Sequence, residues 1–145
     1  MIRRYDIGFY PMSLWVSTIG SFDKCKARFK MYPTIKDMDE DRDGIPLNPE
    51  NKGGVTYLVI EKKTGSKGVL ILISEPNVDK VTDFDFDVSA HESVHAADAV
   101  FDVISAYSTG YDEGNEPYAY LVGYIAGRIG SYLIEYTKSK RENNE

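Results

Sequence analysis

Two short apolar runs joined by a polar turn place the strongest constraint on the fold. Residues 55–60 read Val-Thr-Tyr-Leu-Val-Ile, and residues 69–73 read Val-Leu-Ile-Leu-Ile. Their many β-branched side chains favour strands over helix. Residues 61–68 between them are mostly polar and contain Thr-Gly-Ser-Lys-Gly, a composition typical of a hairpin turn. The sequence therefore predicts a β-hairpin over residues 55–75.

Two helical patterns follow the hairpin. Residues 90–104 contain neither Gly nor Pro, and apolar, His and Asp side chains recur at helical spacing from about residue 87. After a loop with two glycines, Asn115-Glu116-Pro117 begins a second helix, because Pro is well tolerated in a first turn. The sequence thus predicts a helix pair within residues 87–138.

The N-terminal region, residues 1–54, predicts shorter elements. Residues 4–10 alternate loosely and indicate a strand stopped by a proline, which residues 14–16 continue after a bend. A serine in the N-cap position precedes a short predicted helix over residues 22–30. Residues 36–54 are acidic and rich in Pro and Gly, which indicates a long loop. The order of strand, helix, hairpin, helix and helix indicates an α+β fold with a small mixed or antiparallel sheet.

The size and charge of the chain exclude several classes of protein. A length of 145 residues suits one domain, so we expect residues 1–145 to fold as a single unit. A net charge of −6 and a pI near 5.0 disfavour a nucleic-acid binder, which needs a basic face. The single cysteine, Cys25, excludes an internal disulfide framework.

No segment has the pattern of a membrane or export signal. The first residues include two arginines, but no apolar stretch of signal-peptide length follows them. Residues 118–134 are short for a membrane span and contain Arg128 near their middle. We therefore expect a cytoplasmic protein without a membrane partner; the sequence does not predict its oligomeric state.

Both histidines of the chain lie in one pentapeptide, His91-Glu92-Ser93-Val94-His95. On a helix, residues four apart lie on the same face, so the two imidazoles can bind one metal ion. Glu92 lies about 100° around the helix from His91, where it can reach a metal-bound water without binding the metal. This His-Glu-x-x-His pattern predicts one Zn²⁺ per chain.

Two other interpretations of the pentapeptide are open. Ser89 and Glu92 also fit a capping box, in which Glu92 would only complete the start of a helix. Alternatively, the histidines hold zinc in a structural or interaction protein that has no catalytic activity.

A catalytic zinc takes three protein ligands and keeps a fourth position for water. Since the chain has no third histidine, we expect the remaining ligand to be a carboxylate. Glu116 is the best candidate, because it begins the second helix after a loop long enough to reverse direction. Asp98 and Asp102 are the rivals, but ligands from one straight helix surround an ion poorly. They are better placed, with Asn115, to hydrogen-bond the ligands from outside.

The second predicted helix carries a stripe of small residues: Ala119, Gly123, Gly127 and Gly130. Such a stripe lets another helix approach closely. We expect the histidine-bearing helix to be that neighbour, which would bring Glu116 toward the histidines.

At these residues the chain resembles the gluzincin group of zinc metallopeptidases. The matching segments are residues 91–95 and, downstream, Asn115-Glu116-Pro117-Tyr118-Ala119-Tyr120, within a match over residues 89–133. The resemblance implies a minimal zincin-like domain in which a small sheet packs on the histidine helix and a glutamate helix. It also implies that both histidines and Glu116 bind zinc and that Glu92 is the general base in peptide-bond hydrolysis.

The chain departs from this group at two points. Many gluzincins carry Asp four residues after the third ligand, where this chain has Tyr120. Many also have a downstream His or Tyr that stabilises the oxyanion. Because no further His is present, the resemblance implies a tyrosine, and Tyr120 and Tyr111 are the first choices.

The resulting hypothesis is a zinc-dependent metallopeptidase, a hydrolase whose substrate is a peptide or protein. One hairpin strand, either residues 55–60 or residues 69–74, is expected to lie at a sheet edge and pair with an extended substrate.

A second metal pattern lies in the predicted loop. Asp39-x-Asp41-x-Asp43-Gly44 followed by Glu50 matches a calcium-binding loop, with hard oxygen ligands at alternate positions. The prolines and glycines that follow interrupt the exit helix that such a loop needs. A Ca²⁺-binding module and a solvated acidic loop are therefore both open.

Overall fold

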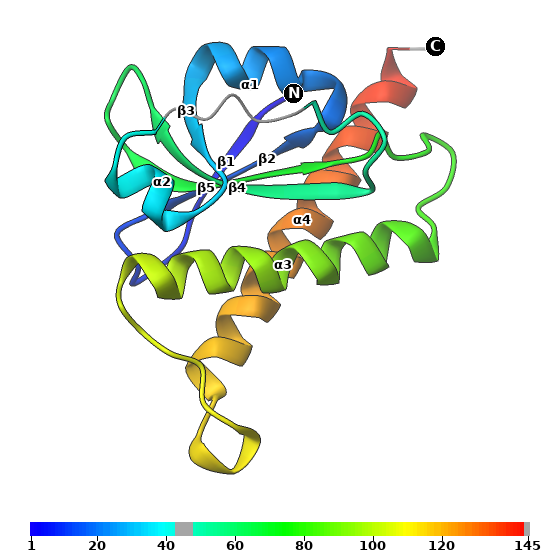
Figure 1. The fold of residues 1–145 in the computed structure, drawn as a ribbon. Helices are drawn as coiled ribbons and strands as arrows, with labels where there is room; N and C mark the ends of the chain where they lie inside the picture. Colours follow the sequence, from blue (N-terminus) through cyan, green and yellow to red (C-terminus); the bar gives the residue numbers. More distant parts are fainter. Residues whose placement is uncertain (43–47, 144–145) are drawn as a thin grey trace.

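The structure, a computed structural model, describes residues 1–42 and 48–143. Within these residues, five strands form one sheet in the order β1-β2-β5-β4-β3 (Figure 1). The strands are β1 (Arg3–Asp6), β2 (Ser13–Thr18), β3 (Phe29–Tyr32), β4 (Gly54–Glu61) and β5 (Lys67–Ile73). Neighbouring strands are antiparallel except for β2 and β5, which are parallel. The fold is therefore α+β with a mixed sheet, as the order of patterns predicts.

The predicted hairpin is confirmed as β4 and β5, which pair from Ile60 opposite Lys67 to Gly54 opposite Ile73. The prediction that one hairpin strand lies at a sheet edge holds only in part. β5 lies between β2 and β4, so residues 69–73 are interior, and the expectation that they lie at an edge is wrong. β3 pairs with β4 only over Leu58–Glu61, so among the described residues no strand covers the outer side of residues 54–57.

The N-terminal region differs from its prediction. Instead of one bent strand, β1 and β2 form a second antiparallel pair, with Gly8 at a positive φ of 66° in the loop between them. The short helix α1 (Phe22–Arg28) ends earlier than predicted, because Phe29 begins β3 and pairs with β4. A turn of 3-10 helix, η1 (Ile19–Ser21), leads into α1, and the side chain of Ser21 makes no capping bond. The short helix α2 (Ile35–Asp39) begins the segment predicted as a loop.

Helices cover both faces of the sheet (Figure 1). α1 lies on one face; α3 (Asp83–Val103) and α4 (Glu116–Glu142) lie on the other. Because successive side chains of a strand point to opposite faces, β2 contributes Trp15 to the core under α1 and Leu14 and Val16 to the core under α3 and α4. The first core includes Trp15, Phe22, Cys25, Phe29, Tyr57 and Leu70. The second includes Leu14, Val16, Ile71, Ala96, Val100, Ile125, Ile129 and Tyr132.

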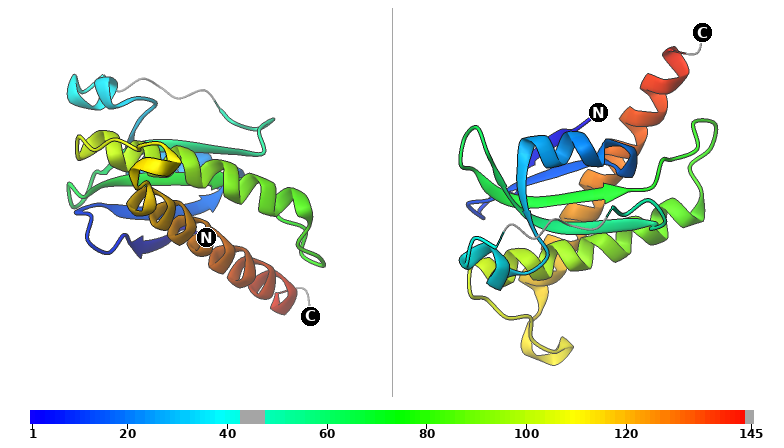
Figure 2. Two further views of the ribbon diagram at one scale, coloured as in Figure 1. Left: turned by 90° about the horizontal axis from the view of Figure 1, so that it is seen from below. Right: turned by 45° about the horizontal axis from the view of Figure 1, so that its top comes forward.

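α4 runs obliquely to α3 and buries Leu121, Ile125 and Ile129 (Figures 1 and 2). The predicted packing of the small-residue stripe is wrong. A Cβ added at Gly123, Gly127 or Gly130 would meet no atom within 4 Å. The apolar stripe at helical spacing determines which side of α4 is buried, and it turns the glycines away from α3.

The loop between the two long helices contains a single 3-10 turn, η2 (Tyr111–Glu113). Among the described residues, no helix is both long and apolar enough to cross a membrane.

Candidate functional site

The start of α3 resolves one of the open interpretations. Thr82 and Asp85 form a capping box, in which the side chain of Asp85 accepts from the backbone N–H of Thr82. Ser89 lies inside the helix, where its hydroxyl donates to the carbonyl oxygen of Asp85 at 2.7 Å. The alternative cap formed by Ser89 and Glu92 is therefore wrong, because the helix begins two turns earlier than that cap requires.

The two histidines lie together on the surface of α3. Their Nε2 atoms are 3.1 Å apart and the ring centroids 4.7 Å apart. Two nitrogens that bind one tetrahedral zinc at about 2.0–2.1 Å lie roughly 3.3 Å apart. The separation of His91 and His95 therefore fits two ligands of a single ion.

Glu92 is held between α3 and β4. Its side chain is buried, with 4% of the residue exposed, and Thr56 Oγ1 of β4 donates to Glu92 Oε2 at 2.7 Å. Gly54 provides the space for this arrangement, since a Cβ there would lie 2.7 Å from Glu92 Cγ and 2.9 Å from Glu92 Oε1. One oxygen of the Glu92 carboxylate is thus hydrogen-bonded to the sheet, and the backbone of β4 at Gly54 limits the movement of the side chain.

These groups line a cavity of about 540 Å³ between α3, β4 and the turn that leads into α2. His91, Glu92 and His95 form part of one wall, and the uncovered end of β4, which contacts Glu92, forms part of another. A smaller cavity of about 280 Å³ adjoins it beside Gly54 and Asp87.

Glu116 stands apart from the histidines. It is the first residue of α4, is exposed, and does not line the cavity. Within residues 1–42 and 48–143, no three His, Cys, Asp or Glu side chains form a group that could hold a metal ion. Asn115 precedes Glu116 as the N-cap residue and makes no side-chain capping bond. Their roles as a zinc ligand and its supporting neighbour stay predictions.

The start of α4 is attached to α3 through Tyr118, which the sequence did not single out. Its hydroxyl donates to Asp98 Oδ1 at 2.7 Å and lies 3.4 Å from the carbonyl oxygen of Val94. Burial, followed by the hydrogen bond and the charge of Asp98, raises the pKa of Tyr118 to about 12. The two tyrosines expected to stabilise an oxyanion lie elsewhere: Tyr111 and Tyr120 are 89% and 74% exposed and do not line the cavity.

Thr56 and Gly54 were also missed by the sequence analysis. A glycine pair directly before a strand was the available signal, because such pairs mark close backbone approach. Nothing local distinguishes Thr56 from any other threonine in a strand; only its position opposite Glu92 does.

Asp98 and Asp102, expected to act from outside the metal, both line the cavity. Asp98 accepts from Tyr118. Neither carboxylate takes part in an ion pair among the described residues.

The predicted calcium loop is described only in part. Asp39 is the last residue of α2, and Asp43 lies outside the described residues. The side chain of Glu50 accepts from the amide of Asn48 at 3.0 Å.

Asp41 is committed to other partners. Its carboxylate accepts from Tyr32 Oη at 2.6 Å and from Lys30 Nζ at 3.3 Å. These hydrogen bonds, that of Tyr32 first, hold the pKa of Asp41 below its usual range. A calcium ion at this carboxylate would compete with Lys30, and calcium binding stays a prediction.

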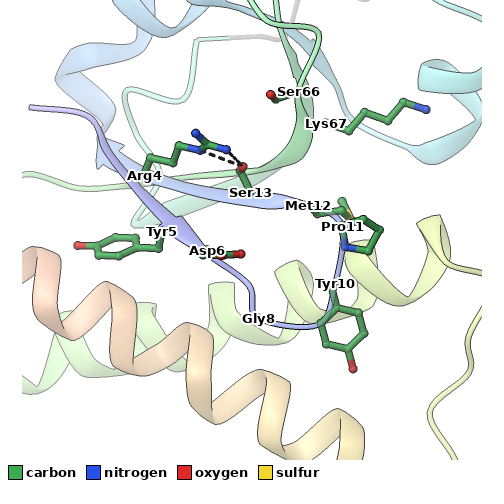
Figure 3. A pocket seen from close by; sticks show the side chains of 10 residues that line it. All are labelled: Arg4, Tyr5, Asp6, Gly8, Tyr10, Pro11, Met12, Ser13, Ser66 and Lys67. Atoms are coloured by element: carbon green, nitrogen blue, oxygen red, sulfur yellow. Dashed lines mark hydrogen bonds between the residues drawn. The ribbon is translucent and has the colours of Figure 1, made fainter.

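Another cavity, of about 640 Å³, lies beside the loop that joins β1 to β2 (Figure 3). Arg4 donates to Ser13 Oγ there from Nε at 3.0 Å and from Nη2 at 2.9 Å. None of the predicted site residues lines this cavity.

No family model matches the chain, and no curated protein or solved structure is significantly similar to it.

Proposed function

We propose that this protein is a zinc-dependent peptidase whose site is built on α3. One observation carries the proposal: two imidazole nitrogens 3.1 Å apart stand beside a buried carboxylate in the wall of a cavity. Buried carboxylates next to paired imidazoles are the groups that zinc-assisted hydrolysis needs. The packing of α3 and α4 on one face of a mixed sheet is consistent with the zincin-like arrangement that the resemblance implies.

The donor atoms present fit zinc in type. Imidazole nitrogen and carboxylate oxygen are both common zinc ligands. His91 and His95 would hold the ion, and Glu116 is proposed as the third ligand, since Tyr118, two residues further along α4, is hydrogen-bonded to Asp98 of α3. When bound, zinc would polarise the substrate carbonyl and lower the pKa of water toward ~7.

Glu92 is proposed to move the proton. Thr56 occupies Oε2, so Oε1 is the oxygen that accepts the proton of the attacking water. The same carboxylate then returns the proton to the amine that leaves when the peptide bond breaks. Thr56 acts by orienting Glu92, because its hydrogen bond and the close contact at Gly54 restrict the side chain.

Residues 54–57 of β4 would bind the substrate backbone. Their outer side has no strand partner among the described residues, and they lie in the wall of the cavity that holds the histidines. An extended peptide can add to such an edge through main-chain hydrogen bonds.

Elemental analysis and turnover test the proposal together. We expect about one zinc per chain, lost in His91→Ala and reduced in Glu116→Gln, with Glu113→Gln as the control from the neighbouring exposed turn. Glu92→Gln should keep its zinc and lose at least about 100-fold in the cleavage of an unfolded protein, the usual contribution of a general base.

Two outcomes would replace this proposal. If Glu92→Gln cleaves as well as the wild type, the catalytic assignment is wrong. If the wild type holds zinc but cleaves nothing, the alternative of a catalytically silent zinc-binding protein is favoured, and the separation of Glu116 from the histidines supports that alternative.

A further inference from the structure

The cavity beside α3 has two ends of unlike charge. Lys52 lines the end where β4 begins, and Asp98 and Asp102 line the other end, near α2. The histidines lie between these ends along α3. The substrate-binding surface is therefore polarised along its length.

The acidic end lies at a defined distance from the histidines. Asp102 follows His95 by seven residues, which is close to two helical turns, so the two side chains share a face about 10 Å apart. Asp98 lies between them on that face. A long basic side chain extends roughly 6 Å, and an extended chain advances about 3.3 Å per residue. A Lys or Arg within about three residues of the bond at the histidines would therefore reach the two carboxylates.

The two carboxylates are only partly compensated. Tyr118 holds Asp98 in place through a hydrogen bond of 2.7 Å and leaves its other oxygen open. The side chain of Asp102 has no hydrogen bond or ion pair to the residues that the structure describes. Like charges four apart on a helix repel each other, so a cation between them is favourable.

Three aliphatic side chains line the same cavity as these carboxylates. They are Ile35, Leu58 and Ala99, of which Ile35 and Ala99 are partly exposed. Lys and Arg bury their methylene stems against such surface while the charged end stays with polar partners. Two carboxylates beside aliphatic side chains are complementary to a basic side chain and not to an acidic one.

We propose that this cleft selects peptides with a Lys or Arg side chain, which binds between Asp98 and Asp102 and makes Asp102 a specificity-determining residue. This inference rests on the proposed function, because it names the substrate class of the same site. Since Tyr118 already holds Asp98, the binding geometry is formed before the substrate arrives.

A binding experiment tests this selection separately from catalysis. Fluorescent peptides that differ only by Lys or norleucine at one position are titrated into the zinc-loaded Glu92→Gln protein and followed by anisotropy. We expect the Lys peptide to bind about tenfold more tightly, the effect of one charged hydrogen-bonded pair. Asp102→Asn should remove this preference, whereas Asp112→Asn, with the same charge change on the exposed turn η2, should keep it.

Equal binding of the two peptides, or an equal loss of preference in Asp112→Asn, would overturn the selection. The latter result would mean that the net charge of the protein, and not the cleft, attracts the peptide. Should Glu92→Gln not fold, the same titration is made on the wild type in chelator. Turnover is measured in parallel: its absence with a retained Lys preference contradicts the peptidase assignment alone, and turnover without a preference contradicts the selection alone.

Discussion

Gly54→Ala tests whether the backbone of β4 positions Glu92. The new Cβ would lie 2.7 Å from Glu92 Cγ, 2.9 Å from Glu92 Oε1 and 2.9 Å from Val88 Cγ1. Carbon atoms in contact normally lie about 3.5–4.0 Å apart, so either β4 moves away from α3 or the side chain of Glu92 turns away. The second response breaks the bond from Thr56.

Each response costs stability by a comparable amount. Overpacking of this kind costs about 1–3 kcal/mol, and loss of a hydrogen bond to a charged group costs about 1.5–3 kcal/mol. The lower entropy of the unfolded Ala chain offsets about 0.4–1 kcal/mol. We therefore expect Gly54→Ala to lower the free energy of unfolding by about 1–2 kcal/mol.

Gly53→Ala is the matched control. Its Cβ would meet Phe84 Cζ at 3.0 Å and Val88 Cγ2 at 3.1 Å, and it does not approach Glu92. Phe84 is 56% exposed and can move by a few tenths of an ångström, so we expect a change within about 0.5 kcal/mol. In an active enzyme, only Gly54→Ala should also lower kcat.

Urea unfolding measured by the fluorescence of Trp15 gives both numbers, because this residue is the single tryptophan and is fully buried. Equal midpoints for the two variants, with unchanged turnover, would refute the positioning of Glu92 by the β4 backbone.

Three further predictions concern the fold. Gly68→Ala should cost at least about 3 kcal/mol or prevent folding, because its Cβ would lie 2.0 Å from the carbonyl oxygen of Ser13 on the parallel neighbour strand. Gly127→Ala, whose Cβ would meet no atom within 4 Å, should instead stabilise α4 by up to about 1 kcal/mol. Equal urea midpoints for these two variants would contradict both predictions. Burial, and then the bond to Asp98, raises the folded-state pKa of Tyr118 to about 12, above its ordinary value near 10. The neutral phenol therefore stabilises the fold fully below pH 10, and this contribution is lost as the pH rises toward 12. Tyr118→Phe should therefore show a smaller loss of stability between pH 9 and 12 than the wild type, and identical slopes in the two proteins would refute this.

The elements predicted correctly are those whose signal is local. β4 and β5 are rich in β-branched residues on either side of a turn, and the two long helices have helical periodicity. The relative placement of three candidate site residues is local in the same way. His91, Glu92 and His95 are placed by helical spacing alone, so their mutual geometry follows from the sequence once α3 forms.

The elements that were missed depend on partners distant in the chain. β3 is four residues long and follows directly from α1; pairing of Phe29 and Tyr32 with β4 makes it a strand. The hydrogen bond between Thr56 and Glu92 joins residues 36 apart. Neither leaves a local pattern, since the energy that fixes them arises only when the sheet and α3 pack together.

The position of Glu116, the third proposed ligand, also depends on how the helices pack and not on a local sequence pattern. α3 is oriented by a face that includes Ala96, Ala97 and Val100, all fully buried, and this orientation turns the histidines to the cavity. α4 is oriented by Leu121 and the buried residues that follow it, and Glu116 at its start is exposed. Tyr118 provides the hydrogen bond that joins the first turn of α4 to α3. A zinc ion that bound all three proposed ligands would therefore need the exposed first residue of α4 to approach two histidines that α3 already holds in the wall of the cavity.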